Sequence, residues 1–176
     1  MTPAEPPRLS RLVPVPTYRD SPVTGICDLR GVDLAGRPLD VEVVGPGRWT
    51  LLVFLSSGCY GCREFFAAAG DPQASGLVTD ESVVVVTRDA DEEDPVALAD
   101  LAAPGTRLLM STPAWSAYRV HGPPFFVLAD GSRPRVVTEG VAWGVGQVAS
   151  HLRAARAGSA GPEVPRLTPG PDPGSR

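Results

Sequence analysis

The sequence predicts an α/β fold, a mixed central sheet with helices on both faces. Residues 50–55 and 82–87 are continuous apolar runs, which are typical of strands buried on both faces of a sheet. Helical patterns separate the strand candidates in the middle of the chain, and this order predicts parallel pairing there. A tight-turn pair joins runs 125–128 and 135–138, which predicts an antiparallel hairpin at one edge.

The remaining elements follow from the same patterns in chain order. Residues 26–44 alternate apolar and polar side chains around a turn, so we expect a short N-terminal hairpin. A helical pattern starts at Tyr60 and ends at Ala69, before a Gly-Asp-Pro stop. The other expected elements are a helix over 92–103, a strand over 107–110, a short helix over 112–119 with Thr112 as its N-cap, and a closing helix over 146–157.

The distribution of proline predicts one folded domain between two loose ends. Eleven of the 20 prolines lie in residues 1–23 and 158–176. We therefore expect a flexible Pro-rich N-terminus over 1–23, a single domain over 24–157 and a disordered Pro/Gly-rich tail over 158–176.

Composition excludes several classes of function. All 16 basic residues are arginine and the chain has no lysine or asparagine, so Schiff-base and P-loop lysine chemistry is excluded. The net charge is -4 and the arginines are scattered, which disfavours nucleic-acid binding. The chain shows no transmembrane run and no secretory signal, so we expect a cytoplasmic protein, or an exported one if the start codon is misassigned.

The pattern Cys59-Tyr60-Gly61-Cys62 is the most informative feature of the chain. Two cysteines three residues apart at a helix start come within disulfide range. Unpaired N–H groups and the helix dipole stabilise a thiolate on the first cysteine. Cys59 is therefore the expected nucleophile and Cys62 the resolving thiol of thiol–disulfide exchange.

Two other interpretations of the cysteine pair stay open. A zinc site would need about four ligands, and only Cys27, His121 and His151 are available besides the pair, without a second ligand spacing. The two cysteines could also be buried and inert. Their position between a buried strand and a helix favours the redox interpretation, with no metal and no cofactor.

Three segments together resemble the thioredoxin superfamily: the run 51–55, the cysteine motif 59–62 and the segment 120–131, which reads Val-His-Gly-Pro-Pro-Phe-Phe-Val-Leu-Ala-Asp-Gly. The N-terminal hairpin and the form of the last segment are most similar to TlpA/ResA-type thiol–disulfide oxidoreductases and their MauD-type relatives. The resemblance covers about residues 24–157. It implies a thioredoxin-like fold with a cis Pro124 facing the disulfide, where an X-Pro bond makes the cis form accessible.

The chain departs from the family pattern at three positions. Gly58 stands where tryptophan is common, and Val53 stands where thioredoxins place a buried acid, so no obvious proton acceptor serves Cys62. Pro123 replaces the usual threonine or isoleucine and removes a hydrogen-bond donor beside the sulfurs. These departures leave the redox potential open.

Several further residues are candidates for a role. We expect Tyr60, which lies between the cysteines, to be exposed. Tyr60 and Gly61, together with Pro123 and Pro124, are expected to contact substrate, and His121 to modulate the thiols. Cys27 is either a third redox thiol or, as we expect, a small buried residue, and His151 is expected to be a surface residue. The tryptophans Trp49, Trp115 and Trp143 are expected to pack in the interior, and the acidic residues Asp89, Asp91, Glu92, Glu93 and Asp94 to be a solvated helix start.

The favoured function is a thiol–disulfide oxidoreductase that uses the Cys59 and Cys62 pair. It would act as a monomer on protein thiols and disulfides, with an unidentified electron donor and with no nucleic acid or membrane partner. One alternative is a thioredoxin-fold interaction module without redox activity. Another is a peroxiredoxin-like thiol peroxidase, although the residues before Cys59 lack the proline and threonine that position a peroxide.

Overall fold

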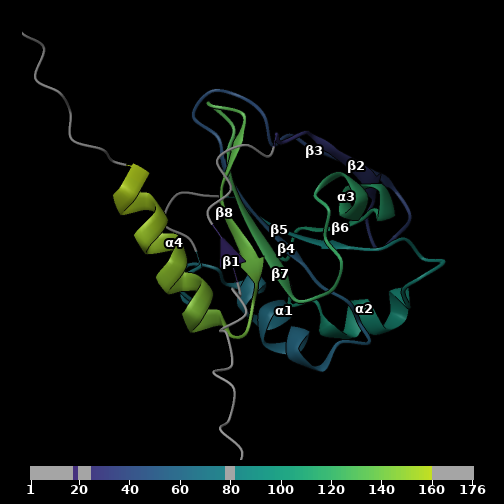
Figure 1. Cartoon of the computed structure of the whole chain (residues 1–176). Helices are drawn as coiled ribbons and strands as arrows, with labels where there is room; N and C mark the ends of the chain where they lie inside the picture. Colours follow the sequence, from purple (N-terminus) through teal and green to yellow (C-terminus); the bar gives the residue numbers. More distant parts are fainter. Residues whose placement is uncertain (1–17, 20–24, 78–81, 160–176) are drawn as a thin grey trace, which may run out of the picture.

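The computed structural model describes residues 18–19, 25–77 and 82–159. Within these ranges the strands form one mixed sheet in the order β1-β8-β7-β4-β5-β6-β2-β3 (Figure 1). The strands are β1 (Tyr18–Arg19), β2 (Leu29–Val32), β3 (Pro38–Val41), β4 (Trp49–Phe54), β5 (Ser82–Thr87), β6 (Leu108–Met110), β7 (Phe125–Asp130) and β8 (Arg135–Val141). The predicted α/β class and the mixed sheet are confirmed.

Strands β4, β5 and β6 pair in parallel, and β7 pairs antiparallel with β8, as the sequence predicted. Strand β7 also pairs antiparallel with β4, a pairing that the sequence did not specify. The short strand β1 pairs with β8, in a segment where the sequence analysis placed no element. Most of the two terminal segments lie outside the described residues, so the expectations about them stay predictions.

Strand β4 is buried on both faces, which explains its unbroken apolar run. Leu51 and Val53 belong to the hydrophobic cluster on one face, and Leu52 and Phe54 belong to the cluster on the other. Alternate residues of a strand point to opposite faces, so a strand between two cores is apolar at nearly every position, and Thr50 is the one buried polar residue of β4. The carboxyl end of β4 therefore emerges from the middle of the molecule.

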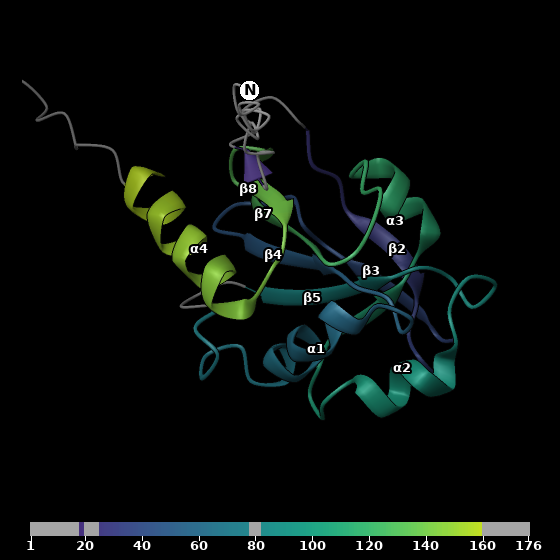
Figure 2. The same ribbon diagram turned by 60° about the horizontal axis from the view of Figure 1, so that its bottom comes forward.

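Helices cover both faces (Figure 2). Helices α1 (Arg63–Gly70), α2 (Pro95–Leu101) and α4 (Val145–Ser159) pack on one face, and α3 (Thr112–Ala117) packs on the other. Helix α2 is shorter than predicted because Asp94 caps it, accepting hydrogen bonds from the N–H groups of Val96 and Ala97. The predicted cap of α3 is wrong: Ser111 accepts from the Ala114 N–H and is the N-cap, so Thr112 is the first helical residue.

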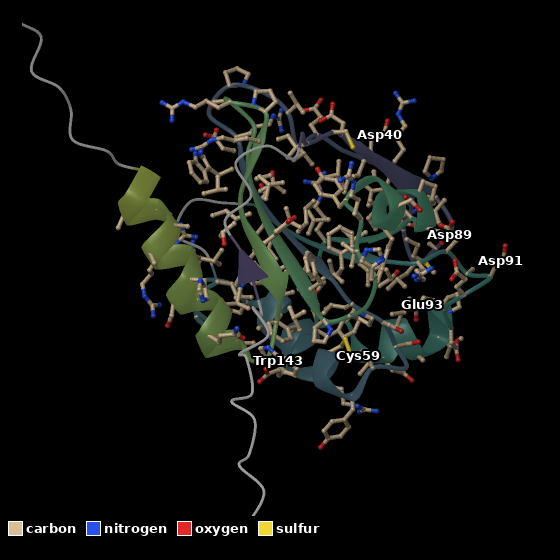
Figure 3. The ribbon with its side chains drawn as sticks, in the orientation of Figure 1. Asp40, Cys59, Asp89, Asp91, Glu93 and Trp143 are labelled. Carbon is tan, nitrogen blue, oxygen red and sulfur yellow. A yellow bond between two sulfur atoms is a disulfide. The ribbon has the colours of Figure 1, made fainter. Side chains whose placement is uncertain are left out.

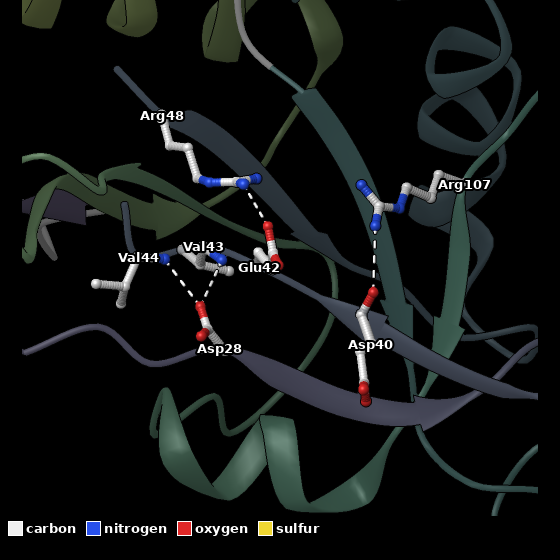
Figure 4. A network of polar contacts seen from close by, with 7 residues as sticks. All are labelled: Asp28, Asp40, Glu42, Val43, Val44, Arg48 and Arg107. Carbon is white, nitrogen blue, oxygen red and sulfur yellow. Dashed lines mark hydrogen bonds and ion pairs between the residues drawn. The ribbon is translucent and has the colours of Figure 1, made fainter. Parts of the chain in front are cut away.

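The N-terminal hairpin is confirmed. Its strands β2 and β3 are four residues each and lie inside the expected range 26–44, with β2 beginning at Leu29 and β3 ending at Val41. It extends the sheet beyond β6, where Gly31 approaches so closely that a Cβ there would collide with the Met110 carbonyl. Polar contacts hold the end of the hairpin (Figure 4). The Asp28 carboxylate accepts from the Val43 and Val44 N–H groups at 2.7 and 2.9 Å.

Two expectations about packing are wrong. His151 is half-buried on α4, and its ring lies 6.4 Å from the ring of Phe126, because this turn of the helix faces the sheet. Trp143 is 71% exposed, because it lies in the connection between β8 and α4 and not inside either element. Trp115, by contrast, is buried as expected, with an edge-to-face contact to Phe54.

Candidate active site

The cysteine pair lies directly after the central strand. Cys59 and Cys62 form a disulfide, with their Cα atoms 5.3 Å apart. Residues Tyr60–Cys62 form a 3-10 turn that continues into α1, and the Cys62 N–H donates to the Cys59 carbonyl at 3.1 Å. The predicted helical start is therefore confirmed, with a tighter first turn than an α-helix.

The two sulfur-bearing residues differ in exposure. Cys62 is fully buried in the core beneath α1, whereas Cys59 is half-buried at the edge of the same cluster. The first N–H groups of a helical turn have no partner within the turn, so they stay available to an anion at its start. An incoming reactant can reach Cys59 and not Cys62, and this difference matches the chemical roles expected of the two residues.

A cis peptide bond joins Pro123 and Pro124, as expected, and the loop faces the cysteine turn. A Cβ built on Gly61 would lie 3.8 Å from Cγ of Pro124, which is ordinary van der Waals contact. The Pro124 carbonyl accepts from the Ala142 N–H at 2.9 Å, and this bond connects the proline loop to the residue that follows β8. Both prolines are half-buried and neither has an N–H group.

Two aromatic side chains project beside the disulfide. Tyr60 is 91% exposed, as predicted, and Trp143 is 71% exposed. Figure 3 shows Trp143 at the same end of the molecule as Cys59. The Glu64 carboxylate fixes this arrangement by accepting from the Val145 N–H at 3.1 Å, which ties α1 to the segment that follows Trp143. Sequence reasoning assigned Trp143 to the core and so missed it.

Glu93 is the second residue that sequence reasoning missed. It was expected in a solvated helix start, but it is only 8% exposed and contacts the turn before Cys59. A usable signal was present: the carboxyl ends of parallel strands β4 and β5 meet at one edge, so the loops that follow them are neighbours. The rest of the acidic cluster behaves differently, because Asp91, Glu92 and Asp94 are exposed as expected.

The remaining candidate residues, His121 and Cys27, are exposed and have no recorded contact with the disulfide. His121 is exposed, three residues before Pro124. Cys27 is an exposed free cysteine that forms no disulfide, so the expectation that it is buried is wrong. Its pKa is raised, first by partial desolvation and then by the charge of Asp28. Among the described residues there is no cluster of metal-binding side chains, and none of the described helices is long and apolar enough to cross a membrane.

A thioredoxin-like fold with a cysteine pair at the end of its central strand is the class that these features define. Solved structures with this fold include a protein from Chlorobium tepidum described as a DsbE-type thiol:disulfide interchange protein. It is 21% identical, with a TM-score of 0.60, over 81% of this chain and 100% of that one.

Two other solved structures agree. A secreted disulfide oxidoreductase from Mycobacterium tuberculosis is 17% identical, with a TM-score of 0.56, over 72% of this chain and 95% of that one. The exposed lipoprotein thioredoxin Etrx1 of Streptococcus pneumoniae is 16% identical, with a TM-score of 0.57, over 74% of this chain and 99% of that one. No family model matches the chain, and no curated protein matches it. The comparisons establish the thioredoxin-like fold.

Proposed function

We propose that this protein is a thiol–disulfide oxidoreductase that exchanges disulfides with protein cysteines through Cys59 and Cys62. The observation that supports this most directly is the disulfide itself, which joins a half-buried and a buried cysteine at a helix start, opposite a cis-proline loop. The solved structures with the same fold include proteins described as disulfide oxidoreductases, and this adds support.

The exchange proceeds in two steps. In the reduced protein, the Cys59 thiolate attacks one sulfur of a substrate disulfide, forms a mixed disulfide and releases the other substrate sulfur as a thiolate. The Cys62 thiolate then attacks the Cys59 sulfur and releases the second substrate thiolate. Two electrons pass from the dithiol to the substrate, and both released thiolates take up protons. A second dithiol, the electron donor, returns the Cys59–Cys62 disulfide to its reduced form by the reverse sequence.

The substrate peptide lies between the cysteine turn and the proline loop, in contact with Tyr60, Gly61, Pro123 and Pro124. Because neither proline has an N–H and the Pro124 carbonyl already bonds to Ala142, the Pro123 carbonyl is the backbone group of this pair that can accept from the peptide. His121, in the same loop, adjusts the proton balance of the thiols. No cofactor takes part, and the monomer is sufficient.

A redox titration of the pair tests this function. Protein with Cys27→Ser would be equilibrated in dithiothreitol and glutathione buffers, alkylated and weighed. We expect a reversible two-electron transition, near about -270 mV for a reductase or near about -120 mV for an oxidant. If no intramolecular disulfide forms at any potential, the oxidoreductase function is wrong and the fold serves as an interaction module.

A further inference from the structure

Glu93 places a carboxylate against the segment that precedes the dithiol. It comes from the loop between β5 and α2, and its side chain is 8% exposed. In Figure 3 its label and that of Cys59 lie at the same end of the sheet. Val53 offers no acid within β4, so Glu93 is the buried carboxylate that the fold brings to this turn.

Ser57 binds Glu93 with two hydrogen bonds. Its backbone N–H donates to Oε2 at 2.9 Å, and its hydroxyl donates to the same oxygen at 2.6 Å. Hydroxyl-to-carboxylate bonds of this kind are short and strong. Ser57 is two residues from Cys59, and consecutive Cα atoms are about 3.8 Å apart, so the carboxylate lies on the order of 10 Å from the reactive sulfur.

The same turn positions Cys59. The Cys59 N–H donates to the Ser56 carbonyl at 3.2 Å, and the Gly58 N–H donates to the Ser56 hydroxyl at 3.3 Å. Anchoring Ser57 therefore anchors the whole turn from Ser56 to Cys59. The anchor is itself held, because the neighbouring Glu92 carboxylate binds Arg88 and accepts from the Thr112 hydroxyl.

Glu93 is the most buried charged residue on the elements around this turn. The other charged or titratable residues there are exposed or half-buried: Arg63 and Glu64 on α1, Arg88, Asp89, Asp91, Glu92 and Asp94 on the β5–α2 loop, and His121 before Pro124. Water screens exposed charges far more effectively than buried ones. The charge of Glu93 is therefore the least screened of these charges.

We propose that Glu93 is a positioning residue that holds the Ser56–Cys59 turn and whose negative charge opposes thiolate formation on the reduced cysteines. A like charge disfavours an anion, and only the reduced pair can be anionic, so the charge favours the disulfide over the dithiol. The inference rests on the proposed exchange function, and it means that Glu93 makes the pair a stronger reductant.

Three variants separate charge from anchoring. Glu93→Gln keeps an oxygen that accepts from Ser57 but removes the charge. Ser57→Ala keeps the charge but removes the hydroxyl that partly neutralises it. Asp91→Asn removes an exposed charge from the same loop and is the matched control. The measurement is the rate of Cys59 alkylation in the fully reduced protein across pH, followed for the Cys59 peptide by mass spectrometry.

The two test variants should change the rate in opposite directions. At pH 7, Glu93→Gln should raise it about twofold to fourfold and lower the midpoint of the pH profile, given the Coulomb interaction over this separation and the lower nucleophilicity of a more acidic thiol. Ser57→Ala should lower the rate about twofold, and Asp91→Asn should change it less than either. In glutathione buffers, Glu93→Gln should shift the equilibrium toward the dithiol.

A merely structural anchor would give another result. If Glu93→Gln and Ser57→Ala change the rate in the same direction, or if Glu93→Gln matches Asp91→Asn, the inference is overturned. Should Glu93→Gln fail to fold by circular dichroism, Ser57→Ala decides: a slower rate together with a raised midpoint of the pH profile supports the inference, and an unchanged midpoint contradicts it. Alkylation of the reduced thiol needs no substrate, so this outcome is independent of whether the protein proves to be an oxidoreductase.

Discussion

The molecule has two cysteine sites, which differ in exposure, in disulfide pairing and in the groups around the sulfur. Cys59 is half-buried, pairs with Cys62 and begins a helical turn. Cys27 is exposed, follows no helix start and has the Asp28 carboxylate beside it. The more exposed cysteine is the less reactive by these criteria, because a thiolate needs nearby donors more than it needs access to water.

The carboxylate beside Cys27 stays charged over a wide pH range. Hydrogen bonds from the Val44 and Val43 N–H groups lower the pKa of Asp28, so its charge persists well into the acid range. That charge adds to partial desolvation in raising the pKa of Cys27. The groups placed around each cysteine therefore predict a less reactive Cys27 and a more reactive Cys59.

The largest expected effect is on disulfide exchange. Cys59→Ser should lower the rate of reduction of a disulfide-bonded peptide by at least about 100-fold, because it removes the attacking sulfur. Cys27→Ser, the matched control, should leave the rate unchanged. Equal losses in the two variants would show that the comparison is wrong and that Cys27 takes part in exchange.

A smaller effect is expected on the reactivity of Cys27. Asp28→Asn should speed alkylation of Cys27 at pH 8 about twofold, because removing the negative charge brings its pKa back toward the ordinary value. Asparagine keeps an oxygen for the Val43 and Val44 N–H groups. Desolvation is the larger cause of the raised pKa, so the recovery should be incomplete. The rate at Cys59 should not change, and peptide-resolved mass spectrometry measures both sites at once.

The backbone around Cys27 depends on a single hydroxyl. The Tyr118 hydroxyl donates to the Cys27 carbonyl at 2.9 Å and accepts from its N–H at 3.3 Å. Tyr118→Phe keeps the ring against Phe54 and should lower the free energy of unfolding by about 1 kcal/mol, measured in urea. If Tyr118→Phe left the stability unchanged but made disulfide exchange at Cys59 faster, the two cysteine sites would be coupled.

The smallest expected effect is on the stability of the protein at acid pH. A carboxyl group whose pKa is lowered in the folded state stabilises the protein above its unfolded pKa, and this contribution is lost as the pH falls through the folded value. Asp28 is exposed, so the contribution is below about 1 kcal/mol. Below about pH 4, the unfolding free energy of Asp28→Asn should therefore fall less steeply than that of the original protein. Parallel curves would show that Asp28 plays no part in acid stability.

Local patterns, together with the family resemblance, were sufficient for the fold and for the centre of the site. The apolar run of β4 and the cysteine spacing indicated a buried strand followed by a redox pair, and the resemblance added the cis bond between Pro123 and Pro124. The burial of Glu93 and the exposure of Trp143 were missed, because each depends on which segments meet in space, and for Glu93 the predicted parallel pairing was the one signal available. A charged residue near a helix start is usually solvated, and only the neighbouring β4 loop makes Glu93 an exception.

The errors at single residues have the same origin. Ser111 and Thr112 are both good caps, and the choice between them is made by tertiary contacts: Thr112 instead accepts from the Asp89 N–H, and the Ser111 hydroxyl also donates to the Arg30 carbonyl. Cys27 was expected inside the protein because cysteine is a frequent core residue. Its place before β2 leaves it exposed, which no composition rule reveals.

The hairpin also determines how the sheet ends. Without it, β6 would present open backbone groups along its edge, and such edges recruit strands from other molecules. The hairpin replaces that edge with β3, a strand of four residues that contains Pro38, which has no N–H, and the exposed Asp40. The molecule thereby presents an outer strand that is poorly suited to aggregation.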